Sequence, residues 1–348
     1  MLMWAITKEA TMATLQTAFI SFHDNIKLDD ENETLVEKRE ILLKKLKKKI
    51  SNDAASYTSF NQGSYAMHTG IKPDDGDFDI DVGLEFNINK DDYSDPVKVK
   101  KWVKDALDGH TKSVTIRRSC VTVQYQENDE PIYHVDFAIF ASNNADGKLY
   151  IAKGKENSDS SNKVWEVSDP KGLMSCIRDK FTESKDRAQF RRAIRYLKKW
   201  KSKKFTSSGN SAPTGIALTI LAYDLFHVSK TYDYVSTGYK YDDFTALVNL
   251  VDSIKSAFTL TYDFDSDSDL YTISTFLPVE PYNDLFSKMT TKQQDAFYNK
   301  IVDLSSKLDE VESKSLLSEK CVVLQSIFGD DDFPIKSARS IIGSHESA

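Results

Sequence analysis

The sequence has few cysteines, and they lie far apart. Only three occur in 348 residues, Cys120, Cys176 and Cys321, with no CxxC pair and no Cys/His cluster. Isolated thiols at these spacings do not form a structural zinc site, and an odd number of them does not form a disulfide framework. We therefore expect reduced cysteines, as is typical of cytoplasmic proteins.

Long apolar runs and an excess of positive charge are also absent. The longest apolar stretch, 215–226, is interrupted by Thr219 and Asp224, whereas a membrane-spanning helix needs about 20 apolar residues. Lys8 and Glu9 stand where a signal peptide has its apolar segment. The net charge of −7 argues against a stable nucleic-acid partner, so a nucleotide would bind at a local basic patch. The sequence thus predicts a cytoplasmic protein with no membrane partner.

Several familiar functional motifs are missing as well. The sequence contains no GxxxxGK[ST] loop, no HExxH pair and no nucleophile elbow. The alternating aspartates of 263–269 lack the glycine and glutamate that a calcium loop requires, so we expect a solvated acidic loop there. The apolar content of 40% still predicts a folded globular protein, and the length allows two domains.

What the sequence does contain is an acidic and apolar alternation at 77–82, DFDIDV. Its period of two predicts a strand with the apolar residues on a buried face and Asp77, Asp79 and Asp81 on the other. Successive carboxylates on one side of a strand stand about 6.6 Å apart. They repel each other and are costly to desolvate, and a divalent cation would remove that cost.

A second run, 134–141, repeats this pattern with one carboxylate. Val135, Phe137 and Ile139 alternate with small or polar residues, among which Asp136 is the only acid. If the two strands are neighbours, Asp79, Asp81 and Asp136 converge. Mg²⁺ prefers oxygen ligands shared between carboxylates and phosphates, and two such ions can hold both oxygens of a phosphoryl transfer.

Three further segments offer groups for a triphosphate. The Gly63-Ser64 turn lets backbone N–H groups and a hydroxyl approach phosphate oxygens. A basic stripe that includes Lys198 follows the edge of an amphipathic helix, where a solvated surface stripe is the alternative interpretation. Pro213 can begin a helix whose first N–H groups bind an anion, with Ser211 or Thr214 adding a hydroxyl.

The Gly-Ser turn, the DxD strand and the single aspartate on another strand together resemble the polymerase-β-type nucleotidyltransferases. GSYAMHTGIKPDDGDFDIDV and HVDFAIFA are similar to the corresponding motifs of the bacterial relatives of cGAS and oligoadenylate synthase, the CD-NTases. The resemblance implies that Asp79 and Asp81 bind two Mg²⁺ ions, with Mn²⁺ as a substitute, and that Asp136 binds the catalytic one. Asp77 offers an overlapping DxD, but the family's strand continues where Val82-Gly83-Leu84 follow Asp81.

The resemblance also suggests which groups bind the phosphates. YLKKWKSKK is similar to the family's helix whose lysine reaches the triphosphate, and the register points to Lys198, with Lys199 as the second choice. The family's next turn places a Ser or Thr on the phosphates. Gly215 follows Thr214 where the family usually has a bulkier residue, so Ser211 and Thr214 both stay open.

From these features we expect an α+β, two-lobed polymerase-β-like fold with a mixed-sheet catalytic lobe and a mostly helical second lobe. Residues 1–165 would form the catalytic lobe with N-terminal bracing helices, 166–334 the helical lobe that closes the NTP cleft, and 335–348 a mobile tail. The polar segment 154–163 and the Asp169-Pro170 helix start place the change of lobe near residue 165.

The family implies an enzyme that joins NTPs into a cyclic di- or trinucleotide second messenger and releases pyrophosphate, in CBASS-type antiphage signalling. It also implies a protein partner that acts on the C-terminal tail or regulates activity. A linear oligoadenylate or RNA-end polymerase would use the same aspartates but needs a basic groove. A small-molecule nucleotidyltransferase is usually shorter, and a non-enzymatic binding module would have a damaged triad.

Overall fold

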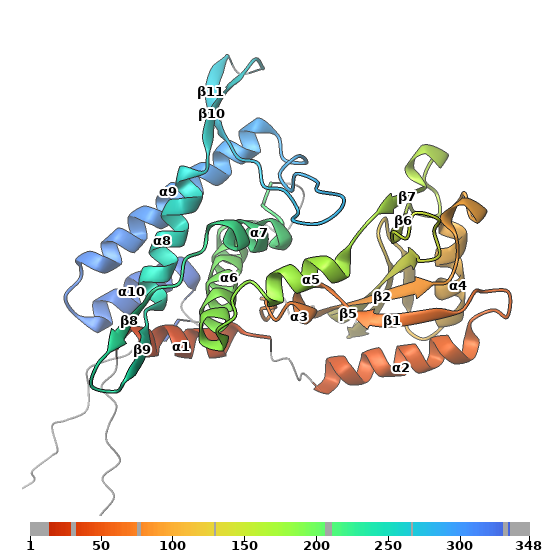
Figure 1. The fold of residues 1–348 in the computed structure, drawn as a ribbon, viewed down its shortest axis with the longest axis horizontal. Helices are drawn as coiled ribbons and strands as arrows, with labels where there is room; N and C mark the ends of the chain where they lie inside the picture. Colours follow the sequence, from red (N-terminus) through yellow and green to blue (C-terminus); the bar gives the residue numbers. More distant parts are fainter. Residues whose placement is uncertain are drawn as a thin grey trace, which may run out of the picture.

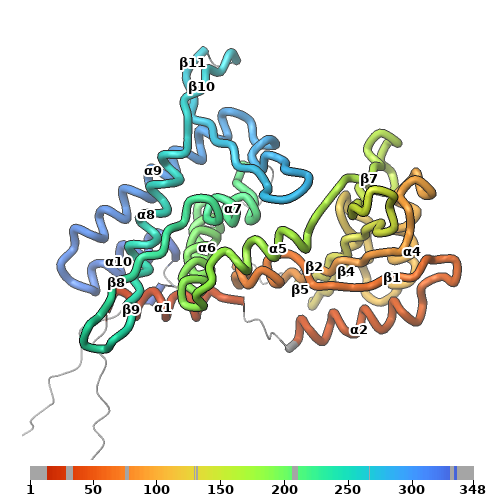
Figure 2. Tube along the Cα trace, in the orientation of Figure 1, coloured from red at the N-terminus to blue at the C-terminus, as the bar shows by residue number. Residues whose placement is uncertain are grey.

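The computed structural model describes residues 14–28, 33–74, 78–128, 130–205, 211–265, 267–329 and 333–334. In these ranges the chain forms two bodies side by side, a sheet lobe and a helical lobe (Figures 1 and 2). Each has its own hydrophobic core. The α+β prediction is therefore confirmed. None of the helices in the described ranges is both long enough and apolar enough to cross a bilayer.

The sheet lobe is built on a seven-stranded mixed sheet in which the path β1-β2-β5-β4-β3 is extended by β6 and β7 from β5. β2 and β5 are parallel, and the other pairs are antiparallel. The strands are β1 (Tyr57–Asn61), β2 (Phe78–Phe86), β3 (Ser113–Ile116), β4 (Val121–Glu127), β5 (Glu130–Ala141), β6 (Tyr150–Lys153) and β7 (Val164–Val167).

The apolar residues of the two alternating runs are buried, as the sequence predicts. Ile80 and Val82 of β2 and Val135 and Phe137 of β5 lie in one core. Helices α2 (Glu33–Lys49) and α4 (Val97–Leu107) contribute leucines and valines to the same core. The acidic residues therefore project from the opposite face of the sheet. The short helix α3 (Gly63–Ala66) and the 3₁₀ turns η1 (Lys90–Asp92) and η2 (Ser160–Asn162) complete this lobe.

The helical lobe packs its helices around α6, and two β-hairpins project from it (Figure 1). Asp169 caps α5 by accepting a hydrogen bond from the Gly172 N–H at 2.8 Å, as predicted, and Gly329 is the C-cap of α10. The elements are α1 (Leu15–Ile26), α5 (Pro170–Arg178), α6 (Ser184–Lys204), α7 (Gly215–Leu225), β8 (Lys230–Asp233), β9 (Gly238–Tyr241), α8 (Asp243–Ser256), β10 (Thr259–Asp263), β11 (Ser268–Thr272), α9 (Thr291–Ser313) and α10 (Leu317–Phe328).

Helix α1 lies in the range 1–165, which we assigned to the catalytic lobe with its N-terminal bracing helices, and it packs on the helical lobe. Its buried residues belong to the helical core, where the Phe22 ring centroid lies 4.7 Å from that of Phe328. The apolar stripe of α1 therefore finds its partners some 300 residues along the chain rather than in the nearby sheet. The predicted mobile tail, 335–348, lies outside the described residues.

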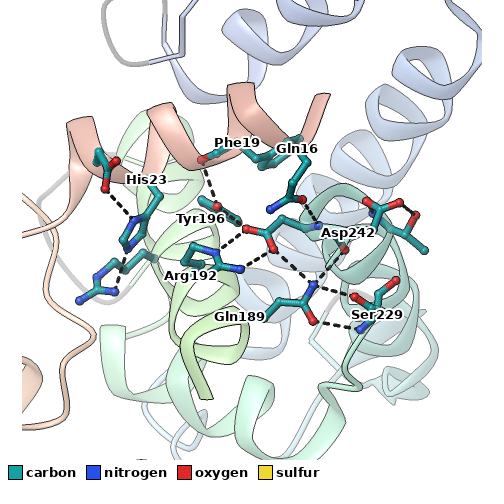
Figure 3. Close-up of polar contacts among 12 residues, drawn as sticks. Gln16, Phe19, His23, Gln189, Arg192, Tyr196, Ser229 and Asp242 are labelled. Carbon is teal, nitrogen blue, oxygen red and sulfur yellow. Dashed lines mark hydrogen bonds and ion pairs between the residues drawn. The ribbon is translucent and has the colours of Figure 1, made fainter. Parts of the chain in front are cut away.

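A buried polar network fixes α1 on the helical lobe (Figure 3). The Asp243 carboxylate accepts hydrogen bonds from Arg192 at 2.5 and 2.8 Å and from the Tyr196 hydroxyl at 2.9 Å. The Asp243 N–H donates to the Gln16 side chain of α1 at 2.7 Å, and the Tyr196 hydroxyl oxygen, whose one proton goes to Asp243, also lies 3.2 Å from the Phe19 carbonyl. A buried ion pair with its remaining hydrogen bonds satisfied specifies one docking arrangement.

Candidate functional site

The parallel pairing of β2 with β5 brings the predicted aspartates together. In this register Asp79 lies opposite His134, and Asp81 lies opposite Asp136. Because side chains alternate along a strand, all four residues project from the same face of the sheet. The convergence that the sequence made conditional on neighbouring strands is therefore present. Asp77 lies outside the described residues.

Three of these side chains form a group that fits a divalent cation. The ligand atoms of Asp79, His134 and Asp136 all lie within 4.8 Å of one another. The His134 Nε2 is 3.3 Å from the Asp79 Oδ1. The sequence interpretation treated His134 only as a polar position in an alternating strand. Its place two residues before Asp136, on the same face, is the signal that would have identified it.

Asp81 lies beneath the Gly63 turn, where its charge is poorly solvated. Burial, followed by the nearby carboxylates of Asp79 and Asp136, raises its pKa to about 8. A bound cation would reverse this effect, because it favours the ionised carboxylate. The donor set of Asp79, His134 and Asp136, with the Asp81 carboxylate beside it, therefore fits a divalent metal ion.

Gly63 is fitted to Asp81 so closely that no other residue has room. Its φ is +69°, and a Cβ at this position would lie 1.8 Å from the Asp81 Oδ2. The neighbouring Gln62 N–H donates to the Asp81 carbonyl at 3.1 Å, which ties the turn to β2. The glycine thus provides both the left-handed backbone and the close approach of the turn to the carboxylate.

Asp136 is held from the strand on its other side. The buried Thr122 of β4 lies opposite Asp136, and its hydroxyl donates to the Asp136 Oδ1 at 2.5 Å. The Cys120 thiol lies 3.6 Å from the Thr122 hydroxyl, and burial together with Asp136 raises the pKa of Cys120 to about 12. Cys120 is therefore an uncharged thiol beside the acidic cluster, and Thr122 fixes one oxygen of Asp136.

A cavity of about 1050 Å³ opens beside the acidic cluster. Asp79, Asp81 and the Gly63-Ser64 turn line it from the sheet lobe, and α6, α7 and the 277–281 segment line it from the helical lobe. Asp136 and His134 are not among its described lining residues and lie on the next strand. The cavity therefore joins two of the predicted metal ligands, Asp79 and Asp81, with the Gly-Ser turn and α6 in one space.

Lys198 is the α6 residue that the register predicted, and it lines this cavity. Its Nζ donates to the Thr69 carbonyl at 3.0 Å and to the Thr69 hydroxyl at 3.1 Å. Burial, assisted by Arg195 and Lys201, lowers the pKa of Lys198 to about 7. Lys199, the second choice, instead lies 2.5 Å from the Asp74 Oδ1 in an ion pair between the lobes.

The start of α7 differs from the sequence interpretation. The helix begins at Gly215, and Thr214 is its N-cap, so Pro213 precedes the helix instead of opening it. The Thr214 hydroxyl accepts a hydrogen bond from the Ala217 N–H at 3.1 Å, because a free amide in the first turn attracts the nearest side-chain oxygen. Thr214 lines the cavity, whereas Ser211 is not among its described lining residues.

Lys201 is a cavity-lining cation that the sequence interpretation missed. It is half-buried, and burial lowers its pKa. Its spacing from Phe190, Ile194 and Leu197 places Lys201 on the apolar face of the helix. A lysine on an apolar face is the signal that would have identified it. Arg195 of the same helix points elsewhere: its Nε donates to the Gly70 carbonyl at 3.0 Å, so it joins the two lobes.

Known proteins resemble both the site and the fold. Residues 58–140 match the family model of the cyclic GMP-AMP synthase DncV-like nucleotidyltransferase domain. The chain is 28% identical over 172 residues to a cyclic GMP-AMP synthase from Escherichia albertii. That stretch is 46% of this chain and 35% of the relative, so the match spans about a third of the relative's length.

Solved CD-NTase structures extend the likeness to both lobes. CdnG from Bradyrhizobium diazoefficiens, in complex with GTP, has a TM-score of 0.66 at 12% identity and covers 92% of this chain and 97% of its own. E. coli CdnC in complex with HORMA-deltaN has a TM-score of 0.63 at 15% identity, with coverage of 91% and 98%. Vibrio cholerae DncV with nonhydrolyzable GTP has a TM-score of 0.59 at 16% identity, with coverage of 90% and 85%. The resemblance to the CD-NTases is thereby confirmed: residues 58–140 match the DncV-like nucleotidyltransferase domain, and the chain is similar in fold to solved CD-NTases.

Proposed function

We propose that this chain is a divalent-metal-dependent nucleotidyltransferase that joins NTPs into a cyclic di- or trinucleotide and releases pyrophosphate. The observation that carries the proposal is the parallel β2–β5 register, which puts Asp79, Asp81 and Asp136 on one face beside a large cavity. The DncV-like domain match over the same strands supports the reaction class. The resemblance to a cyclic GMP-AMP synthase supports the cyclic product.

The cavity offers a binding site for a donor NTP. The backbone of the Gly63-Ser64 turn and the Ser64 hydroxyl would bond phosphate oxygens, with Lys198 opposite them on α6. A phosphate beside Lys198 would restore its full charge, because an adjacent anion raises the pKa of an ammonium. Thr214 or Ser211 would add a hydroxyl, and the geometry favours Thr214, since it lines the cavity.

The carboxylates provide the reacting end of the site. Two Mg²⁺ ions, or Mn²⁺, held by Asp79, Asp81 and Asp136 would neutralise charge on the attacking and leaving oxygens. Asp136 is restrained by Thr122 at one oxygen, which leaves the other to orient the acceptor hydroxyl. The cavity volume of about 1050 Å³ lies at the upper end of the range for a pocket that binds one small ligand. A large cavity is what a reaction between two bound nucleotides requires.

The wider role follows from the same proposal. A cyclic dinucleotide or trinucleotide made in the cytoplasm would act as a second messenger, and we propose antiphage signalling as its setting. The relative CdnC was solved with HORMA-deltaN, which supports a regulatory protein partner for this chain as well. We propose that such a partner acts on the C-terminal tail or on the activity.

The test is incubation of the chain with all four NTPs and Mg²⁺, followed by phosphatase treatment and mass spectrometry. We expect phosphatase-resistant masses of a cyclic di- or trinucleotide, and pyrophosphate in matching amounts. Asp79→Asn should abolish them, whereas Asp53→Asn, a change at an exposed aspartate in the turn between α2 and β1, should not. Linear, phosphatase-sensitive products alone would replace the cyclic proposal with a polymerase. Equal yields from both variants would refute the carboxylate assignment.

A further inference from the structure

We propose that His134 is a nitrogen ligand of the divalent-metal site, so that this site prefers Mn²⁺ or Co²⁺ to Mg²⁺. The inference rests on the proposed function, because it concerns the same metal site. It goes beyond that function by adding a fourth residue to the site and by naming the class of cation that the site selects. Neither the three aspartates nor the domain match assigns a role to this histidine.

The geometry of the cluster points to this role. Among the described residues, the group of side chains able to share one cation is Asp79, His134 and Asp136, with ligand atoms within 4.8 Å of one another. Asp81 is not part of that group. The imidazole is therefore close enough to both carboxylates to bind the same cation.

The fold presents the imidazole in a fixed position. His134 lies in the middle of β5, with Asp79 opposite it on β2 and Gln124 opposite it on β4. Its side chain is only 15% exposed, whereas that of Asp79 is 49% exposed. A cation that enters from the cavity side would therefore reach a half-open carboxylate and a largely enclosed nitrogen atom.

The chemistry of the donor set favours a particular class of ion. Mg²⁺ is a hard ion that prefers oxygen ligands and retains several waters. Imidazole nitrogen suits the later first-row ions better than it suits Mg²⁺, and the affinity of a site with nitrogen and oxygen ligands rises from Mn²⁺ to Co²⁺. A site with two carboxylates and one imidazole should therefore bind Co²⁺ and Mn²⁺ more tightly than Mg²⁺.

A purely electrostatic role for His134 makes the opposite prediction. If the imidazole only pairs with Asp79, it competes with every cation for that carboxylate. Removing it would then leave the affinities for all three ions unchanged or raise them together. A ligand, by contrast, contributes to each ion according to that ion's preference for nitrogen.

The experiment measures metal binding to the full chain without nucleotide, by calorimetry for Mg²⁺, Mn²⁺ and Co²⁺ and by the visible absorption of Co²⁺. In His134→Gln we expect the Kd for Co²⁺ and Mn²⁺ to rise about tenfold or more, and the Kd for Mg²⁺ to change less. A loss of this size is usual when a residue that supports a metal site is replaced. His110→Gln is the matched control, since His110 lies in the same lobe with its Nε2 2.8 Å from the Tyr125 hydroxyl.

A second measurement uses the wild-type chain alone and does not depend on how the variant folds. Among the six histidines, Co²⁺ should shift the imidazole NMR resonances of His134 most strongly. Equal affinity changes for the three ions, a rise in affinity, or an unshifted His134 resonance would overturn the inference. The metal-binding measurement contains no nucleotide, so it can fail independently of the product assay. If the wild-type chain makes a cyclic product but His134→Gln binds all three ions as the wild type does, only the role of His134 is refuted. Selective Co²⁺ binding without any product would refute only the proposed function.

Discussion

Replacing Asp81 with asparagine should stabilise the metal-free protein and remove its response to metal. The wild-type carboxyl is enclosed by the Gly63 turn and lies near Asp79 and Asp136, which together with burial raise its pKa to about 8. Asparagine has the same shape but no charge. The substitution therefore removes an electrostatic cost that the folded protein bears only when no cation is bound.

The pKa of Asp81 also fixes the sign and the pH range of the effect. The folded-state pKa of about 8 lies above the ordinary aspartate value of 3.8. The folded protein therefore binds more protons than the unfolded chain between these values, and its stability falls as the pH rises from about 4 to about 8. At about 1.4 kcal/mol per pKa unit, the full shift corresponds to roughly 6 kcal/mol.

We expect about a third of this value to be measured. Asp81 is only half-buried, and water and side-chain movement screen part of the repulsion. Asp81→Asn should thus raise the free energy of unfolding by ~2 kcal/mol at pH 8, with a smaller gain at pH 5. At about 2–4 °C per kcal/mol, Tm should rise by roughly 4–8 °C.

Thermal unfolding at pH 5 and pH 8 checks this prediction. The metal is first removed with EDTA, and Tm is then measured both without metal and after Mn²⁺ has been added in excess. Mn²⁺ should raise the Tm of the wild type at pH 8 and have little effect on Asp81→Asn. Asp53→Asn serves as the control, because its exposed side chain should change neither response. If Asp81→Asn lowered Tm at pH 8, or gained as much at pH 5 as at pH 8, the account of Asp81 as an enclosed, repelled carboxyl would be wrong.

Three other substitutions address the remaining parts of the site. Gly63→Ala would place a Cβ 1.8 Å from the Asp81 Oδ2 at a φ of +69°, so NTP turnover should fall at least tenfold while Tm drops by only a few degrees; unchanged turnover would contradict the fit. Thr122→Val removes the hydrogen bond to Asp136, worth about 1.5–3 kcal/mol, and should lower kcat about tenfold or more with KM little changed. Lys198→Ala should raise the KM for NTP, and the wild-type KM should itself increase as the pH rises through about 7, where the free lysine loses its charge; a flat profile would argue against Lys198 as a phosphate ligand.

The strands of the site could be predicted because their pattern is local. Period-two alternation in β2 and β5 needs no distant partner, and it correctly separated the buried valines from the aspartates. The cap at Asp169 and the end of α10 at Gly329 are likewise short-range, since each depends on backbone groups a few residues away. The register between β2 and β5 was the missing step, and it brought His134 into the cluster.

The N-terminal helix shows what a local pattern leaves undecided. The amphipathic face of α1 predicts that it packs against something, but not against which lobe. Its position depends on Asp243, more than 200 residues later, whose backbone N–H donates to Gln16. The apolar partners of α1 and its polar contacts both lie far along the chain, in the helical lobe, so neither can be inferred from the local pattern.

The join between the lobes also could not be predicted from the sequence, and it affects how the site would work. Three consecutive contacts run from α6 to the segment before β2: Arg195 with the Gly70 carbonyl, Lys198 with Thr69, and Lys199 with Asp74. The segment that receives them leads directly from the Gly63-Ser64 turn to the aspartates. Two of the three N–H donors of the Lys198 ammonium already have acceptors in Thr69, so a phosphate can bind the one remaining donor, and any further bond to that phosphate must replace a bond to Thr69. Binding of the triphosphate and the seating of the two lobes thus draw on the same side chain, so substitution of Lys198 should alter both.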